Sequence, residues 1–473
     1  MNLALGVLRG RYPGRAAALV SGETHLDREA LAISVARAAG GFRALGVLPG
    51  EPVLLIMRNS LELAVAWLGA VHAGAVAVAV SGRLAEADYR HILSDSGAHY
   101  ALVDESFVEA RKVFVASAVA LPAGEAVAAF DADADTPAFC LYSSGTTGRP
   151  KAVLHAHRVG SVVGEAFRML GLSVGDAVLT TSRFSFAYGL EHGLLAPLAF
   201  GVTSVLIPDW PDAANVLTAV EKHRPRALFS VPTMYRRLIA EPAERLGALR
   251  EVRYFVSAGE RLSPELVKRW RDATGGELLN LYGMSETFCA CMMTPPGTSD
   301  GLRTGTPFPS AEVRLEAGVL WVRHPALARA YANVPNETAA QFRDGWFCSR
   351  DIFVRDVQGY YIHQGRSDEL VKIAGQWVWP TELEEAALSA AAVGEAACVA
   401  VADGDGLHRL ALFVTARGAD DAALAAARAC EELPRHKRPK WVRVVAELPR
   451  TPTGKVQRYR LREMLERELR PSG

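Results

Sequence analysis

Short apolar segments recur along the first part of the chain, and patterns typical of helices separate them. Such segments, bounded by turn residues, are typical of strands buried on both faces. They occur at residues 52–56, 75–80, 100–103, 177–180, 204–207, 227–230 and 254–257. Helical patterns lie at residues 28–45, where Gly40 and Gly41 are predicted to end the helix, and at about 60–72. This alternation predicts an α/β fold with doubly wound parallel sheets.

The sequence pattern changes near Gly301. Short strands and turns follow, which predict a small β-rich, barrel-like unit. Beyond residues 365–368 lie new strand patterns at 397–401 and 410–414 and alanine-rich helical patterns at about 381–392 and 420–431. We therefore predict an N-terminal domain of residues 1–367 and a smaller α+β C-terminal domain of residues 368–473.

Composition excludes several classes of protein. The 52 Lys and Arg residues equal the 52 Asp and Glu residues, so no net field attracts nucleic acid or an anionic membrane. Residues 1–13 lack the pattern of a signal peptide, and the apolar run at 63–80 is interrupted by His72 and glycines. The six cysteines show no framework spacing, and Cys289-x-Cys291 has no second pair to complete a zinc site. These features predict a cytoplasmic protein with reduced thiols and no membrane or nucleic-acid partner.

A loop rich in glycine and hydroxyl residues, Tyr142 to Lys151, lies between two strand patterns. Glycine lets a backbone approach a polyphosphate closely, and hydroxyls, N–H groups and an ammonium donate to it. Arg149 and Pro150 separate Gly148 from Lys151, and no helix pattern follows, so this is not a Walker loop. By composition alone, the loop is either a phosphate cradle or a flexible turn.

Further segments follow this loop in a definite order: Ser257-Ala258-Gly259-Glu260, Tyr282-Gly283-Met284-Ser285-Glu286-Thr287, residues 344–351, 365–384 and 448–458. From about residue 10 to the end, this series resembles the adenylate-forming superfamily. That superfamily includes acyl- and aryl-CoA ligases, adenylation domains of peptide synthetases and firefly luciferases. No dinucleotide, serine-hydrolase or zinc-protease motif competes with the resemblance.

The resemblance implies a site for ATP and Mg²⁺. Phosphate-binding residues would be Ser143, Ser144, Gly145, Thr146, Thr147, Gly148 and Lys151, with Thr147 and Lys151 in catalytic roles. Tyr282 would stack on adenine beside Gly259 and Glu260, Ser285 would contact the α-phosphate, and Glu286 would hold the metal. Asn280 would bond the adenine amino group or is a plain turn residue. Asp351 would bind both ribose hydroxyls, and Arg366 would reach ribose and phosphate.

Two positions depart from the family pattern. Ser349-Arg350 stands where the family usually has Thr-Gly, so the turn before Asp351 is expected to differ. Ala152 occupies a position that is usually glycine.

The C-terminal segments imply a mobile domain. Lys455 would be the catalytic lysine, pairing with carboxylate and phosphate oxygens as charge gathers. Asp368 would be the hinge, and the Gly375 region with Trp377 would let the pantetheine arm of coenzyme A pass. The basic cluster Arg435, Lys437, Arg438 and Lys440 is either a solvated face or a dock for CoA phosphates.

The segments at 184–190 and 231–235 resemble the acyl-pocket walls of benzoate-CoA ligases. The implied substrate-binding residues are Phe186, Ala187, Tyr188, Gly189, His192, Ser257, Ala258 and Gly283. Glu191-His192 replaces small neutral residues and favours a hydroxyl or amino substituent on the ring, unless both side chains face solvent. His155 and His157 are expected to form hydrogen bonds rather than a metal site.

The sequence thus predicts an aryl-CoA ligase that forms an acyl-AMP from an aromatic acid and ATP, then transfers the acyl group to CoA. Two alternatives stay open: an adenylating enzyme that loads a carrier-protein phosphopantetheine or an amine, and a non-catalytic relative that binds acyl-adenylates. A monomer and a homodimer are both compatible with the sequence.

Overall fold

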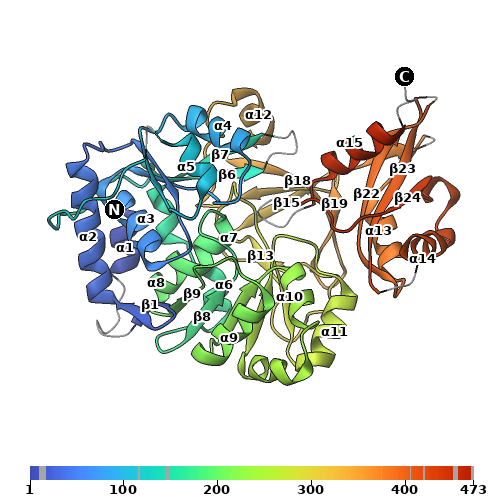
Figure 1. The fold of residues 1–473 in the computed structure, drawn as a ribbon, viewed down its shortest axis with the longest axis horizontal. Coiled ribbons are helices and arrows are strands. Elements are labelled where there is room, and N and C mark those ends of the chain that lie inside the picture. Colours follow the sequence, from blue (N-terminus) through green and yellow to red (C-terminus); the bar gives the residue numbers. More distant parts are fainter. Residues whose placement is uncertain are drawn as a thin grey trace. The chain divides into compact units, whose positions relative to one another are not determined.

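The computed structural model describes residues 1–9, 17–115, 118–144, 149–373, 375–404, 406–418, 421–450 and 456–469 (Figure 1). The chain forms two compact units. The first comprises Met1–Glu316, Trp321–Ser349 and Arg355–Ile362, and the second comprises Ala317–Leu320, Arg350–Val354 and His363–Gly473. The domain boundary after residue 367 stays a prediction.

The larger sheet of the first unit has nine strands in the order β14-β13-β12-β11-β10-β8-β9-β1-β2. Its strands from β12 to β1 run parallel, and β2, β13 and β14 pair antiparallel. The bounds are β1 Ala17–Ser21, β2 Thr24–Asp27, β8 Ala177–Thr180, β9 Thr203–Leu206, β10 Ala227–Ser230, β11 Tyr254–Ser257, β12 Leu278–Tyr282, β13 Met292–Met293 and β14 Thr306–Pro307.

Helices cover both faces of this sheet, because successive strand residues point to opposite sides. Leu228 of β10 packs in a cluster with helices α9 (Ala213–His223), α10 (Pro232–Leu238) and α11 (Pro264–Thr274). Its neighbour Phe229 packs in another cluster, with α6. The remaining helical segments of this region are α6 Glu165–Leu170, α7 Ala187–Leu190, η2 Glu191–Leu195, α8 Ala196–Phe200 and η3 Ala243–Glu251. The doubly wound arrangement predicted from the sequence is therefore confirmed.

The second sheet of this unit has the order β5-β3-β4-β6-β7, and only β6–β7 is an antiparallel pair. The bounds are β3 Pro52–Ile56, β4 Val76–Ala79, β5 Tyr100–Val103, β6 Pro137–Ser144, β7 Pro150–Ala156, α1 Leu3–Leu8, α2 Arg28–Ala44, α3 Leu61–Ala73, α4 Glu86–Ser96, α5 Val108–Val113 and η1 His157–Ser161. Figure 1 shows α1, α2 and α3 grouped together, and α2 and α3 pack in one apolar cluster with Val53 and Leu55 of β3.

The prediction that Gly40 and Gly41 end the first long helix was wrong. Helix α2 continues through both residues to Ala44. A Cβ at Gly40 would lie 1.9 Å from the Glu125 carbonyl oxygen, and one at Gly41 would lie 2.4 Å from that of Pro122. These glycines therefore serve a close approach of segment 121–125 to the helix, not a helix end.

A smaller five-stranded sheet has the order β15-β16-β18-β17, with β19 paired to β18. The bounds are β15 Glu312–Glu316, β16 Val319–Arg323, β17 Phe342–Arg343, β18 Trp346–Arg355, β19 Tyr361–Arg366 and the helix α12 Pro335–Gln341. This is the β-rich segment that the short strands after Gly301 predict.

The second unit contains a hairpin and a three-stranded sheet of order β22-β23-β24. The bounds are β20 Val371–Ile373, β21 Gln376–Val378, β22 Val393–Ala402, β23 His408–Ala416, β24 Trp441–Val444, α13 Pro380–Leu388, α14 Ala422–Ala429, η4 Cys430–Glu432, η5 Arg435–Lys437 and α15 Arg458–Leu469. Helices α13 and α14 pack with Leu412 on one face, and α15 packs with Phe413 on the other. In the part of the chain that the structure describes, no helix has the length and apolarity needed to cross a membrane.

Candidate nucleotide and aryl-acid site

The predicted phosphate-loop segment includes the end of β6 and the start of β7, which pair as antiparallel strands. Ser143 of β6 lies opposite Lys151 of β7 in the antiparallel register. Gly145, Thr146, Thr147 and Gly148 lie outside the described residues, and only the backbone of Ser144 is described. β6 ends at Ser144 and runs parallel to β4, and ligands bind at the carboxyl ends of strands in such sheets.

Lys151 lies in a cluster of charged and aromatic side chains from three segments. Its ammonium pairs with the carboxylate of Glu337 in α12 and lies 5.7 Å from the centre of the Tyr331 ring. The Tyr331 hydroxyl donates to Glu286 Oε1 at 2.6 Å. The structure therefore brings together the two predicted catalytic residues Lys151 and Glu286, which are far apart in the sequence, through Tyr331.

Tyr331 and Glu337 were not predicted from the sequence. They lie in Tyr331-Ala-Asn-Val-Pro-Asn-Glu337, where Pro335 begins α12 and Glu337 falls in its first turn. Pro followed by an acidic residue is a helix-start signal, so α12 was predictable. The pairing of Glu337 with a lysine 186 positions away was not.

The position of Ala152 explains how the chain tolerates a side chain where the family usually has glycine. Ala152 is buried in an apolar cluster with Val78 and Cys140. Its carbonyl oxygen accepts a hydrogen bond from the Ala332 N–H at 2.9 Å, next to Tyr331. The methyl group therefore fills space beneath the strand.

Glu286 is a residue that could hold a magnesium ion. Mg²⁺ commonly takes one or two carboxylates and completes its shell with water and phosphate oxygens. Glu286 supplies one carboxylate, with Oε1 engaged by Tyr331. Among the described residues, no group of three or more acidic, histidine or cysteine side chains forms an all-protein metal site. One protein carboxylate is a number that Mg²⁺ commonly takes when phosphate oxygens and water supply its other ligands.

The predicted adenine side of the site lies at the carboxyl ends of β11 and β12. Gly259 follows β11 with φ +85°, and a Cβ there would meet nothing closer than Val231 at 3.9 Å, so this turn is open. Glu260 is held in place by the Thr233 hydroxyl, which donates to it at 2.9 Å. Tyr282 is the last residue of β12 and is partly exposed.

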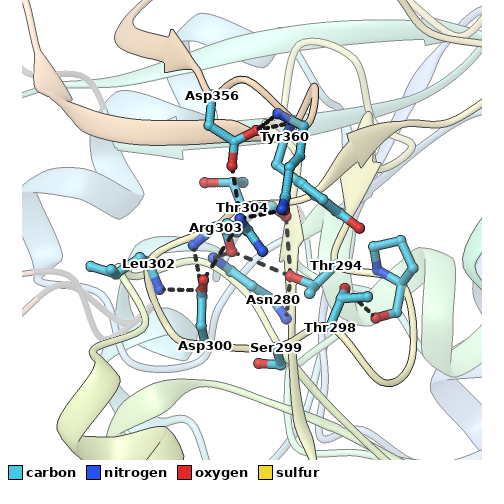
Figure 2. Close-up of polar contacts among 12 residues, drawn as sticks. Asn280, Thr294, Thr298, Ser299, Asp300, Leu302, Arg303, Thr304, Asp356 and Tyr360 are labelled. Atoms are coloured by element: carbon cyan, nitrogen blue, oxygen red, sulfur yellow. Dashed lines mark hydrogen bonds and ion pairs between the residues drawn. The ribbon is translucent and has the colours of Figure 1, made fainter.

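Asn280 belongs to β12, so the alternative that it is a plain turn residue was wrong. Its side-chain amide donates to the Arg303 carbonyl oxygen at 3.5 Å (Figure 2). Arg303 in turn pairs with Asp356 at 2.9 Å and lies over the Tyr360 ring at 4.6 Å. Asn280 thus ties the strand to the loop around residue 303, and its role toward adenine stays a prediction.

The predicted acyl segment packs against the end of β11. The Tyr188 hydroxyl donates to the Val256 carbonyl oxygen at 2.9 Å, directly before Ser257 and Ala258. A Cβ at Gly189 would lie 2.2 Å from the Arg183 carbonyl oxygen, and one at Gly283 would lie 3.0 Å from the Cα of Ala290. Both glycines are therefore required by close backbone packing. Phe186 and Ala187, at the start of α7, are partly exposed.

Glu191 and His192 are buried, at 2% and 1% exposure, so the alternative that they face solvent was wrong. Glu191 accepts hydrogen bonds from the backbone N–H groups of Gly164 at 3.2 Å and Ala290 at 3.1 Å. Burial lowers the pKa of His192, and burial together with the Glu191 carboxylate raises the pKa of the Cys289 thiol. The imidazole is therefore neutral at pH 7.

His155 and His157 form hydrogen bonds, as predicted. His155 Nε2 donates to the Ser285 carbonyl oxygen at 2.9 Å, and His157 Nδ1 accepts from the Leu3 N–H at 2.9 Å. Burial lowers the pKa of both to about 4. His155 therefore fixes the backbone of Ser285, next to Glu286, through this hydrogen bond. The six cysteines are free thiols.

In the second unit, the predicted ribose and hinge residues form one ion-pair group. Arg366 bonds Asp368 through two 2.9 Å contacts and Asp351 at 3.2 Å. His363 lies 3.6 Å from Asp351. The Asp351 and Asp368 carboxylates raise the pKa of Arg366 despite the opposing effect of its burial, so it stays charged.

Arg350 adopts a backbone conformation that glycine usually supplies. Its φ is +62°, and its carbonyl oxygen accepts from the Ser367 N–H at 2.7 Å and the Ser367 hydroxyl at 3.0 Å. Its guanidinium lies 3.6 Å from Asp368. Arg350 and Asp351 therefore lie within β18, and Arg350 takes a left-handed backbone conformation inside that strand even though arginine replaces the family's usual glycine.

This conformation predicts opposite outcomes for two substitutions at position 350. Arg350→Gly is expected to keep the KM for ATP within about twofold, because glycine takes a positive φ without strain. Arg350→Val is expected to destabilise the fold by about 1–3 kcal/mol, since a β-branched residue is an outlier at a positive φ, and to raise the KM. Thermal unfolding and ATP kinetics would check this. Equal behaviour of the two variants would show that the backbone conformation at position 350 does not control Asp351.

The predicted CoA-contacting residues lie on or beside the β20–β21 hairpin. Gly375 has φ +84° and an open Cβ position, and Trp377 is 62% exposed. Three of the four basic-cluster residues have partners on their own unit: Lys437 with Glu382, Lys440 with Asp403 at 3.0 Å, and Arg438 with the Leu433 carbonyl oxygen at 2.9 Å. Lys455 lies outside the described residues.

Lys151 at the start of β7, the carboxylate of Glu286 and the aromatic segment around Tyr188 are features that the resemblance to adenylate-forming enzymes implies. Comparison with known proteins agrees. The AMP-binding enzyme profile matches residues 9–332, and the AMP-binding enzyme C-terminal domain profile matches residues 382–455. The chain belongs to the AMP-binding enzyme family.

Two relatives and one solved structure illustrate the similarity. The chain is 37% identical to a 3-hydroxybenzoate–CoA ligase of Aromatoleum sp. (strain CIB), covering 95% of this chain and 93% of that one. It is 34% identical to a benzoate–CoA ligase of Thauera aromatica, covering 91% and 89%. The crystal structure of a benzoate CoA ligase from Burkholderia xenovorans LB400 matches with a TM-score of 0.89 and 31% identity, over 98% of this chain and 100% of that one.

Proposed function

We propose that this protein is an AMP-forming aryl-CoA ligase. The observation that carries the proposal is the hydrogen bond from Tyr188 to the end of β11. Val256 lies three positions before Gly259, whose turn has open space where a flat base would fit. An aromatic acid and an adenine would thus meet at one strand end, as an acyl-adenylate requires.

The reaction has two parts. In the first, an oxygen of the acid's carboxylate attacks the α-phosphorus of ATP, the bond to the β-phosphate oxygen breaks, and pyrophosphate leaves. Lys151 contributes a positive charge near the phosphates, and Lys455 would contribute a second as negative charge gathers. In the second part, the thiol of CoA loses its proton and attacks the acyl carbon, and AMP leaves with the bonding electron pair.

Two features of the first unit serve positioning. The Lys151 ammonium pairs with Glu337 and lies 5.7 Å from the centre of the Tyr331 ring, so its position does not depend on the nucleotide alone. Magnesium, bound at Glu286, would shield the phosphate charges from the attacking carboxylate. In the second unit, Asp351 and Arg366 would hold the ribose, as the resemblance implies.

CoA is the proposed acceptor because the relatives that match over nearly the whole chain are named CoA ligases. The open, exposed hairpin at Gly375 and Trp377 offers a surface for a pantetheine arm. A carrier protein presents the same arm without the adenosine 3′-phosphate. The acceptor therefore has to be measured directly.

The test measures ATP–pyrophosphate exchange against benzoate, hydroxy- and aminobenzoates, cinnamate, and short and medium fatty acids. CoA or a phosphopantetheinylated carrier is then added to each positive reaction. Exchange confined to aromatic acids, followed by a CoA thioester, is the expected result. Exchange without CoA thioester would move the acceptor to a carrier or an amine. Absence of exchange with every acid would contradict the proposal and favour a non-catalytic adenylate-binding role.

A further inference from the structure

His192 presents a hydrogen-bond acceptor that its own chain does not use. His192 Nδ1 lies 3.0 Å from the Tyr188 carbonyl oxygen, one helical turn earlier. A carbonyl oxygen only accepts, so this contact assigns the proton to Nδ1 and leaves Nε2 with a lone pair. Nε2 is buried, and no group among the described residues bonds it.

The surroundings of this lone pair are aromatic. The imidazole lies 4.8 Å from the ring of Phe229, 5.0 Å from Tyr188 and 6.2 Å from Phe167, measured between ring centres. Leaving a buried acceptor without a hydrogen bond destabilises the folded protein. Such an atom in a native protein therefore calls for a partner, and a bound ligand is one that the chain itself does not contain.

The local backbone supports a functional origin. Residues Glu191–Leu195 form a π-helical turn between α7 and α8. Single π turns inside helices are rare and occur frequently at functional sites. The turn begins at Glu191 and contains His192, the two residues that distinguish this segment from the benzoate-ligase pattern.

Glu191 is not the group that a ligand meets. Its two carboxylate oxygens each accept a backbone N–H, one from Gly164 and one from Ala290. It lies 3.8 Å from His192 Nδ1, too far for a hydrogen bond. Its task is to fix the segment that carries His192.

We propose that His192 is a specificity-determining residue whose Nε2 accepts a hydrogen bond from a hydroxyl or amino substituent on the aromatic acid. This inference rests on the proposed aryl-acid function. A lone acceptor forms hydrogen bonds with O–H and N–H donors, but it forms none with a hydrogen, methyl or fluorine substituent at the same ring position. The favoured substrates are therefore hydroxy- or aminobenzoates rather than benzoate itself.

The first test needs only the unaltered protein. Fluorine is close to a hydroxyl in size but donates no hydrogen bond, so each hydroxybenzoate isomer is compared with the matching fluorobenzoate in CoA-thioester formation. For at least one ring position, kcat/KM is expected to favour the hydroxyl by about tenfold to a hundredfold. Equal values at all three positions would overturn the inference, whether or not any variant folds.

The second test separates the acceptor from the structural contact. His192→Asn can keep a donor near the Nδ1 position but has no acceptor at Nε2, whereas His192→Gln can place its carbonyl oxygen near Nε2. In the Asn variant, the ratio of kcat/KM for hydroxybenzoate to kcat/KM for fluorobenzoate is expected to fall to a value between about 1 and 3. The kcat/KM for the fluorobenzoate itself is expected to change far less. Gln is expected to retain a larger part of the preference.

The two proposals fail in different ways. If His192→Asn leaves the hydroxyl-to-fluorine ratio of kcat/KM unchanged, His192 does not bind the substituent, and it is a core histidine. If aryl acids give no thioester at all, the proposed function fails instead. A loss in Asn that is equal for both acids would indicate a purely structural role.

Discussion

Replacing Lys455 by alanine is expected to slow ATP–pyrophosphate exchange by about 100- to 1,000-fold, the typical effect of removing one group that stabilises transition-state charge. The ammonium would offset the negative charge that gathers where carboxylate and α-phosphate oxygens approach. The KM values for ATP and acid are expected to change little, because the interaction strengthens in the transition state. Steady-state exchange at saturating substrates would measure this.

The second half-reaction separates this role from a general loss of structure. The Lys455→Ala protein is supplied with chemically prepared acyl-AMP and CoA, and thioester formation is expected to stay within about threefold of the unaltered protein. Lys268→Ala is the matched control, because Lys268 is an exposed lysine of α11 that pairs with Asp272. An equal loss in both half-reactions, or exchange that survives the change, would remove Lys455 from the adenylation step.

The parts of the fold that were predictable are those set by local pattern. Buried strands such as Leu228–Phe229 show as apolar runs between turns, and their alternation with helices fixes the doubly wound class. The ends of helices were harder to predict, because a glycine pair can either end a helix or allow another segment to approach it closely. Gly40 and Gly41 have the composition of a helix end, but segment 121–125 crosses them closely, and that segment is more than 80 positions away.

The site residues also divide into those set by local sequence motifs and those set by contacts between distant segments. Lys151 and Glu286 lie in ordered motifs, so they were candidates from the sequence alone. Tyr331 and Glu337 lie in no such motif and become visible only when strand pairing brings Tyr331 opposite Val153. His192 is intermediate. Its type and position made it a candidate substrate-binding residue. Its burial and the unbonded Nε2 could not be predicted, because both depend on the rings of Phe167 and Phe229.

The contact between Glu286 and Tyr331 gives the other large expected effect. Glu286→Gln keeps an oxygen that can accept from the Tyr331 hydroxyl, now 2.6 Å from Oε1, but removes the negative charge. We expect the Mg²⁺ concentration for half-maximal pyrophosphate exchange to rise at least about tenfold, and the maximal rate to fall about 100-fold, because a neutral amide is a poor Mg²⁺ ligand.

Tyr331→Phe separates charge from orientation. It leaves the Glu286 carboxylate in place and removes only the hydrogen bond and the hydroxyl beside Lys151. Its Mg²⁺ midpoint is expected to shift less than about threefold, since loss of one hydrogen bond to a charged group costs less than loss of the charge itself. A magnesium titration of both variants at fixed, saturating ATP makes the comparison. If Gln raises the KM for ATP and leaves the Mg²⁺ midpoint unchanged, Glu286 orients the nucleotide through Tyr331 and Lys151 without holding the metal.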